Sequence, residues 1–111
     1  MSDVLAELQR TLEQRKTAGA DGSYVASLYA KGLNKILEKV GEEATEVIIA
    51  AKDYDQSAES RAALLGEVAD LWFHSMIALA HLGLDQAEVE AVLAQRFGIS
   101  GLTEKAARTQ A

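Results

Sequence analysis

Cysteine and proline are both absent from this 111-residue sequence, and aromatic residues make up only 5% of it. Without cysteine the chain can form no disulfide bond, no thiolate nucleophile and no cysteine-ligated zinc site. Proline interrupts helix interiors and marks many loops, so its absence favours a mostly helical chain with short connections. The abundant Ala, Leu, Glu, Gln and Lys are good helix formers. The composition therefore predicts an all-α fold.

Positive charge is also scarce, since the formal net charge is −6. This charge argues against nucleic acid as a partner, because that binding depends on many contacts from Lys and Arg to phosphates. It leaves room for a small phosphorylated ligand if a divalent cation bridges the acidic site and the phosphates. The length suits a single domain over residues 1–111. Small helical domains often complete their core by association, so we expect a homodimer or a higher homo-oligomer.

Targeting and membrane segments are not expected either. Residues 1–4 do not begin with the basic stretch and continuous apolar run of a signal peptide. The most apolar stretch, residues 64–82, contains Glu67, Asp70, His74 and His81. A membrane span would not tolerate that density of ionisable groups. We therefore expect a cytoplasmic protein without membrane contact.

Apolar periodicity, capping residues and glycines divide the chain into five helices. Ser23 is expected to cap a short helix that Gly32 ends, and Gly83 fits the left-handed position after a long helix. Asp85 and Glu88 have capping-box spacing. The expected helices span about residues 3–16, 23–31, 33–53, 58–82 and 85–97. The short connection near residues 55–57 favours antiparallel packing, which predicts a helix bundle on two long antiparallel helices, completed by homodimerisation.

Each long helix carries a pair of acidic residues at i, i+3 spacing. Glu43 and Glu46 are neighbours on the first, and Glu67 and Asp70 are neighbours on the second. The second helix is apolar around nearly its whole circumference, so we expect it to be largely buried. Carboxylates on a buried helix need a partner, because burying an uncompensated charge is costly.

Antiparallel packing would bring the two acidic pairs together, where they would repel one another. A hard cation with oxygen ligands, Mg²⁺ or Mn²⁺, relieves that repulsion. Such a site suits hydrolysis of a phosphoanhydride, because the metal clamps phosphates and favours attack by water. The alternative is that these acids belong to solvated helix faces, which is the usual meaning of a single Glu-x-x-Glu.

The order of the acids carries a more specific signal. Glu42-Glu43-x-x-Glu46, followed after twenty residues by Glu67-x-x-Asp70, resembles the signature of the MazG-like all-α nucleoside triphosphate pyrophosphatases. Within that superfamily the chain is similar to the phosphoribosyl-ATP pyrophosphatase family. The similarity rests on residues 23–24, 31–52, 67–74 and 96–105 and covers nearly the whole chain from about residue 8.

This resemblance implies that the chain converts phosphoribosyl-ATP and water to phosphoribosyl-AMP and pyrophosphate in histidine biosynthesis. It implies Mg²⁺ as the cofactor, with Mn²⁺ as a substitute, and ligands at Glu43, Glu46, Glu67 and Asp70. Glu42 would orient water or a ligand. The cyclohydrolase domain that is fused to some members is not expected, so the chain should be a stand-alone form.

Basic residues near the acids are candidates for substrate binding. Lys39 precedes Glu43 by one turn, so it either forms an ion pair on the helix or contacts phosphate, and the resemblance favours phosphate. Weaker candidates lie along the same helix and in the C-terminal segment, where they are equally well explained as solvated residues. They are Lys35, Lys52, Arg96, Ser100 and Lys105.

The remaining polar and aromatic residues have structural explanations that we prefer. His74 is expected at a helix–helix seam rather than as a base, and Trp72 in the core or a dimer contact. Tyr24 and Tyr29 would pack, although both could shape a purine pocket. Gly41 costs about 1 kcal/mol in a helix interior and is explained by a close helix approach, for instance across a dimer interface.

Two other functions compete with phosphoribosyl-ATP hydrolysis. A house-cleaning pyrophosphatase for non-canonical nucleotides would use the same acids and metal, and only the Lys-x-Gly-Glu-Glu context and the tail argue against it. A non-enzymatic helical dimerisation module would bind no metal.

Overall fold

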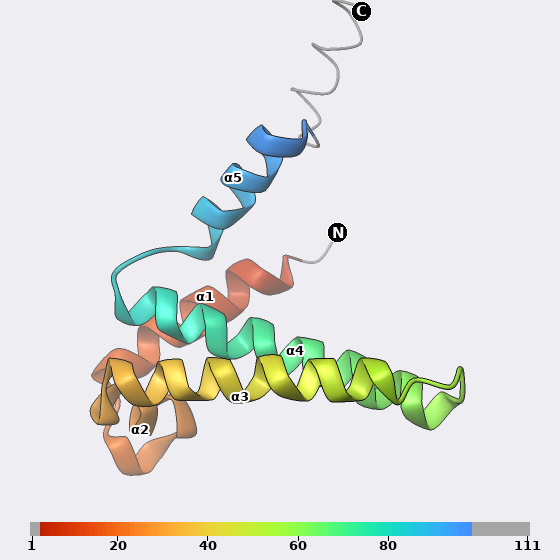
Figure 1. Cartoon of the computed structure of the whole chain (residues 1–111). Helices are drawn as coiled ribbons and strands as arrows, with labels where there is room; N and C mark the ends of the chain where they lie inside the picture. The colour runs from red at the N-terminus through yellow and green to blue at the C-terminus, as the bar shows by residue number, and fades with distance from the viewer. Residues whose placement is uncertain (1–2, 99–111) are drawn as a thin grey trace, which may run out of the picture.

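The computed structural model describes residues 3–98, and every regular element in that range is helical. Two single 3₁₀ turns, Arg15–Thr17 and Ala20–Gly22, lie between the first two α-helices. The first of them includes the last two residues that we expect in the first helix. The all-α prediction is confirmed. The helices are α1 (Val4–Gln14), α2 (Tyr24–Lys31), α3 (Leu33–Lys52), α4 (Ala58–His81) and α5 (Gln86–Phe97) (Figure 1).

The predicted start and stop signals act as expected. Ser23 Oγ accepts a hydrogen bond of 2.9 Å from the Ala26 amide and caps α2. Asp85 and Glu88 form a complete capping box at the start of α5. Gly83 follows α4 with a φ of 79°, a conformation that favours glycine. Local side-chain chemistry thus fixes the helix boundaries.

The two long helices, α3 and α4, form an antiparallel hairpin and lie side by side along most of their length (Figure 1). A turn closes it, in which Ser60 Oγ donates to Asp55 Oδ1 at 2.7 Å and the Ser57 amide donates to the same oxygen at 3.0 Å. The hydroxyl of Ser57, then that of Ser60, and the Ser57 amide lower the pKa of Asp55 to about 2. The hairpin places the acidic pairs of α3 and α4 on facing segments.

The hydrophobic core lies at one end of this hairpin, where α1 and α2 cover it. Leu12, Leu28, Ile36 and Ile77 are fully buried and come from four different helices. The buried residues of α4 all lie in its second half, from His74 onward. In the first half, Leu65 is 59% exposed, and Trp72 further along is 57% exposed. The prediction that this helix is largely buried is therefore wrong for one chain, because α1 and α2 reach only one end of it.

By length and composition alone, α4 is long and apolar enough to cross a membrane. The half of α4 from His74 onward contributes to the hydrophobic core, and His74 bonds to Tyr24 of α2.

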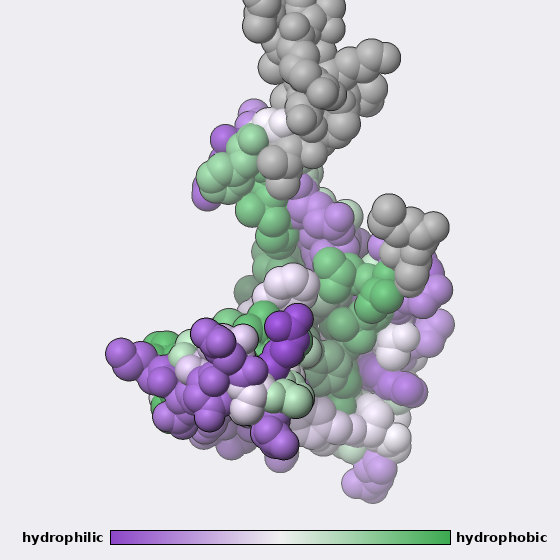
Figure 2. Space-filling model, turned by 90° about the vertical axis from the view of Figure 1, so that its right-hand side faces the viewer, coloured by the Kyte–Doolittle hydropathy of each residue, from purple (hydrophilic) through white to green (hydrophobic). Residues whose placement is uncertain are grey.

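Helix α5 leaves the hairpin and is anchored at its first turn. The amide of Gln86 donates to Oε1 of the buried Gln9 of α1 at 3.2 Å. An apolar groove of about 330 Å³ lies between α1, α4 and α5. Its apolar lining comprises Leu5, Trp72, Met76, Leu79, Val89 and Leu93. Figure 2 shows hydrophobic surface continuing from α5 onto the body below it.

The corner between α2 and α3 gives a prediction for stability. Gly32 has a φ of 97° and a ψ of 178°, a region that is nearly restricted to glycine. We expect Gly32→Ala to lower the free energy of unfolding by about 1–3 kcal/mol, although a Cβ there would meet no atom. Gly19→Ala is the control, because Gly19 has an ordinary φ of −66° and equally open surroundings. Equal denaturation midpoints for both variants would show that the corner is unstrained.

Candidate metal centre and active site

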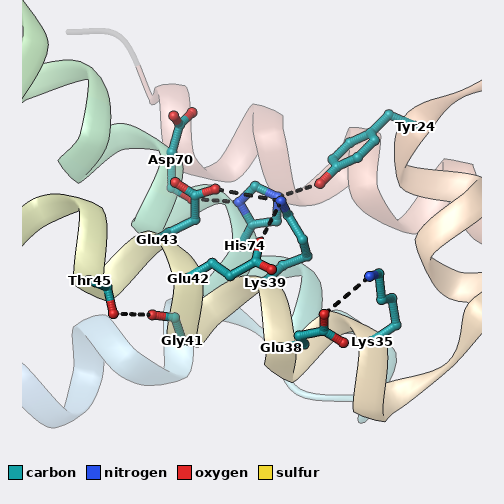
Figure 3. Close-up of polar contacts among 10 residues, drawn as sticks. All are labelled: Tyr24, Lys35, Glu38, Lys39, Gly41, Glu42, Glu43, Thr45, Asp70 and His74. Carbon is teal, nitrogen blue, oxygen red and sulfur yellow. Dashed lines mark hydrogen bonds and ion pairs between the residues drawn. The ribbon is translucent and has the colours of Figure 1, made fainter.

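Three carboxylates from the two long helices meet near the middle of the hairpin. One oxygen from each of Glu43, Glu67 and Asp70 lies within 4.8 Å of one from each of the others. Glu43 comes from α3, whereas Glu67 and Asp70 lie one turn apart on α4. Antiparallel packing is what brings residues so distant in the sequence together. Figure 3 shows Glu43 and Asp70 beside each other, with His74 next to them.

Glu46, the fourth predicted ligand, is exposed and lies outside this group of three. It still belongs to the same electrostatic field. Desolvation raises the pKa of the Glu67 carboxyl, and the negative charges of Glu46, Asp70 and Glu43 raise it further, in that order. Four acids therefore act on one another, although only three have converged.

The donor set suits a hard divalent cation. All contributing atoms are carboxylate oxygens, which Mg²⁺ and Mn²⁺ prefer. Mutual repulsion disfavours the charged state of these acids in the absence of a cation. The nearest cationic group that the described residues offer is Lys39, whose Nζ lies 3.9 Å from Glu43 Oε1. A divalent cation would supply the compensation that one lysine at the edge cannot.

Lys39 and Glu42 form a pair at the border of the acidic group. Lys39 Nζ lies 3.0 Å from Glu42 Oε2. The hydrogen bond to Glu42 is the main cause that raises the pKa of Lys39, and the same bond lowers the pKa of Glu42. Both groups are therefore charged over a wide pH range. The alternative role for Lys39, an ion pair with Glu43, is present at 3.9 Å, and the shorter contact to Glu42 leaves the ammonium group beside the carboxylates.

His74 is buried at the seam between helices, as expected, and both ring nitrogens are bonded. Nδ1 lies 2.8 Å from the backbone oxygen of Asp70, and Nε2 lies 2.7 Å from the hydroxyl of Tyr24. A carbonyl oxygen only accepts, so Nδ1 carries a hydrogen. In the neutral ring Nε2 then accepts from the Tyr24 hydroxyl. Sequence reasoning missed this partner, although a histidine on an apolar helix signals that one is needed.

The weaker candidates for substrate binding that the structure describes lie further from the acids. Lys35 bonds to Glu38 at 3.3 Å and precedes Glu43 by eight residues, which is about 12 Å along a helix. Lys52 is exposed in the last turn of α3, and Arg96 is exposed in the last turn of α5. Ser100 and Lys105 lie outside the described residues.

Comparison with known families identifies the family of this chain. The family model described as phosphoribosyl-ATP pyrophosphohydrolase matches residues 5–97. The chain belongs to this family. Its members are hydrolases of histidine biosynthesis that release pyrophosphate, and the family implies a divalent metal. The match confirms the resemblance seen in the acidic motif and excludes the non-enzymatic dimerisation module. It also favours the histidine-pathway activity over the house-cleaning alternative.

The raised pKa of Glu67 gives a prediction for stability. A carboxyl whose folded-state pKa lies above its unfolded value lowers stability at neutral pH, and this penalty disappears as the pH falls through the folded-state pKa. We expect Glu67→Gln to raise the melting temperature of the metal-free protein at pH 7. The gain should shrink towards pH 4.5, as wild-type Glu67 becomes protonated. Thermal melts in EDTA at several pH values test this, and a lower melting temperature of the variant at pH 7 would contradict it.

Proposed function

We propose that this chain hydrolyses phosphoribosyl-ATP to phosphoribosyl-AMP and pyrophosphate with Mg²⁺ held by Glu43, Glu46, Glu67 and Asp70. The convergence of Glu43, Glu67 and Asp70 within 4.8 Å is the observation that carries this proposal. The exposed side chain of Glu46 is free to turn towards the group as the fourth ligand. Mn²⁺, which accepts the same oxygen ligands, is expected to substitute.

The reaction needs charge neutralisation on the phosphates and a positioned water molecule. A bound divalent cation supplies Lewis acidity, which neutralises phosphate oxygens and makes phosphorus more open to attack. Lys39 adds a second positive charge at the edge of the acids, where it contacts a phosphate oxygen. In the overall reaction water adds to phosphorus, the bridging bond between the α- and β-phosphates breaks, and pyrophosphate leaves.

Glu42 has two tasks in this arrangement. Through Oε2 it holds Lys39 at 3.0 Å and keeps the ammonium group in place. Its other carboxylate oxygen accepts a hydrogen bond from the attacking water and orients it. The lowered pKa of Glu42, caused first by the hydrogen bond from Lys39, keeps the carboxylate ionised for this role.

The more distant basic residues are proposed contacts for the outer parts of a long substrate. Lys35 and Lys52 lie on α3 on either side of the acids, and Arg96 lies on α5. Ser100 and Lys105 follow α5 in the sequence. Lys35 and Lys52 are proposed for the ribose phosphate or the terminal phosphates, because both lie away from the acids along α3.

We further propose a single-domain cytoplasmic enzyme that works as a homodimer or a higher homo-oligomer. Exposed apolar side chains along α4 and α5 support this association, because a chain of this size leaves them uncovered. Among them are Leu65, Trp72, Val89, Val92 and Phe97. Histidine biosynthesis as a metabolic pathway supports the cytoplasmic location.

The acids can be tested one at a time. We expect Asp70→Asn to lower turnover about a hundredfold or more, since metal assistance is worth several kcal/mol. Asn keeps the shape but loses the charge that holds the cation, so Mg²⁺ should no longer raise the melting temperature as it does for the wild type. Pyrophosphate release at saturating Mg²⁺ and melts with Mg²⁺ or EDTA measure both effects.

Glu59→Gln is the matched control, because Glu59 is exposed in the first turn of the same helix and lies outside the motif. It should leave turnover and the response to Mg²⁺ nearly unchanged. Near-normal turnover of Asp70→Asn would refute the metal assignment. Loss of activity through unfolding would make the acids structural.

Association of two copies is tested by sedimentation. At micromolar concentration the wild type should sediment at about twice the 11.9 kDa chain mass or more. Leu65→Lys should shift it towards the monomer, because a charge placed in an apolar interface must be desolvated. Ala20→Lys adds the same charge at an exposed site near α2 and should leave the mass unchanged. A folded wild-type monomer at that concentration would disprove the association.

A further inference from the structure

Tyr24 lies near the acidic group, and its side chain is both hydrogen-bonded and exposed to solvent. It is the first residue of α2, and the Ser23 cap fixes the backbone there. Its hydroxyl lies 2.7 Å from Nε2 of the buried His74, yet the residue as a whole is 49% exposed. One end of the ring is therefore held firmly while much of the side chain faces solvent.

The anchor depends on α4 itself. The backbone oxygen of Asp70 accepts from His74 Nδ1, which leaves Nε2 to accept from Tyr24. A buried acceptor without a partner costs about 1–3 kcal/mol, so the Tyr24–His74 bond is strongly favoured. The imidazole also meets the tyrosine ring edge to face, with ring centroids 5.8 Å apart. The position of the Tyr24 ring is thus tied to the helix turn that carries Asp70.

Lys39 links Tyr24 to the phosphate-binding part of the site. Figure 3 shows the Tyr24 hydroxyl bonded to His74, and Lys39 bonded to Glu42 and paired with Glu43. In its ionised form Tyr24 would also raise the pKa of Lys39, after the hydrogen bond from Lys39 to Glu42, so the two side chains lie close together. A substrate with its phosphates at Lys39 and the acids therefore has Tyr24 as a neighbour.

The hydroxyl has no hydrogen left to donate to phosphate, because His74 receives it. What Tyr24 offers to a ligand is its aromatic face, which suits the one aromatic group of the substrate. We propose that Tyr24 is the platform on which the purine base of the substrate stacks. This inference rests on the proposed function.

The other aromatic residues of the described chain are less suited to this role. Trp72 follows Asp70 by two residues, about 200° around the helix, and lines the apolar groove beside α5. Tyr29 bonds to the backbone oxygen of Leu12 at 3.0 Å and stacks on His81. Burial, and then the charge of Glu13, raises the pKa of Tyr29 to about 12, in keeping with a packing role.

Steady-state kinetics with phosphoribosyl-ATP separates a stacking platform from a structural contact. Stacking of a base on an aromatic side chain is worth about 1–3 kcal/mol, so Tyr24→Leu should raise KM about tenfold. Its kcat and the Mg²⁺ concentration for half-maximal rate should change by less than about threefold on the same reasoning. If Tyr24→Leu folds poorly, Tyr24→Met serves as a second non-aromatic variant. It should show the same rise in KM.

Tyr24→Phe is the decisive comparison, because it keeps the ring and removes the bond to His74. Its KM should stay much closer to the wild type than to Tyr24→Leu, even though its melting temperature falls. Tyr54→Leu is the control, since Tyr54 is a similarly exposed tyrosine at the far end of α3. It should leave KM unchanged.

The outcomes distinguish this inference from the function on which it rests. Equal KM values for the Phe and Leu variants, or a loss of kcat with unchanged KM, would overturn the platform. Failure of the wild type to release pyrophosphate from phosphoribosyl-ATP would overturn both proposals. Normal turnover of the wild type together with an unchanged KM of Tyr24→Leu would overturn the stacking role of Tyr24 and leave the proposed function standing.

Discussion

Repulsion between carboxylates at the seam of α3 and α4 is the constraint on which the rest of the structure depends. Glu43, Glu67 and Asp70 are held within 4.8 Å of one another by a hairpin whose own packing must outweigh their mutual charge. The apolar core at one end and the hydrogen-bonded turn at the other keep the helices together. The protein thus uses hydrophobic burial to hold an arrangement that electrostatics alone would disperse.

Neutral and charged groups have separate tasks around this seam. The acids and Lys39 are the charged groups of the candidate site. Tyr24 and His74 provide a hydrogen-bonded connection from α2 to α4. With a neutral imidazole this connection carries no net charge. The acidic group therefore depends on two long helices, whereas the neighbouring Tyr24 ring depends on a short helix that is placed by the corner at Gly32.

Local signals in the sequence were enough to predict the helices, because caps such as Ser23 and Asp85 act within three residues of themselves. The approach of the two acidic pairs could also be predicted, because the acids have i, i+3 spacing on each long helix and a short connection makes the helices antiparallel. The Tyr24–His74 bond was not predictable, since it joins residues 50 apart and no periodicity marks it. Burial of α4 was overestimated, because an apolar circumference shows that a helix needs cover but not which chain supplies it.

The length of chain between contacting residues gives the two parts of the site different entropic costs of closure. Only residues 53–57 separate α3 from α4, so the acidic hairpin closes a short loop and forms at little entropic cost. The Tyr24–His74 bond closes 50 residues, and the contact between Gln9 and Gln86 closes 77. Closing these longer loops costs more chain entropy than closing the hairpin. The contacts that hold α2 and α5 in place therefore need more stabilisation from packing than the connection between the two acidic segments does.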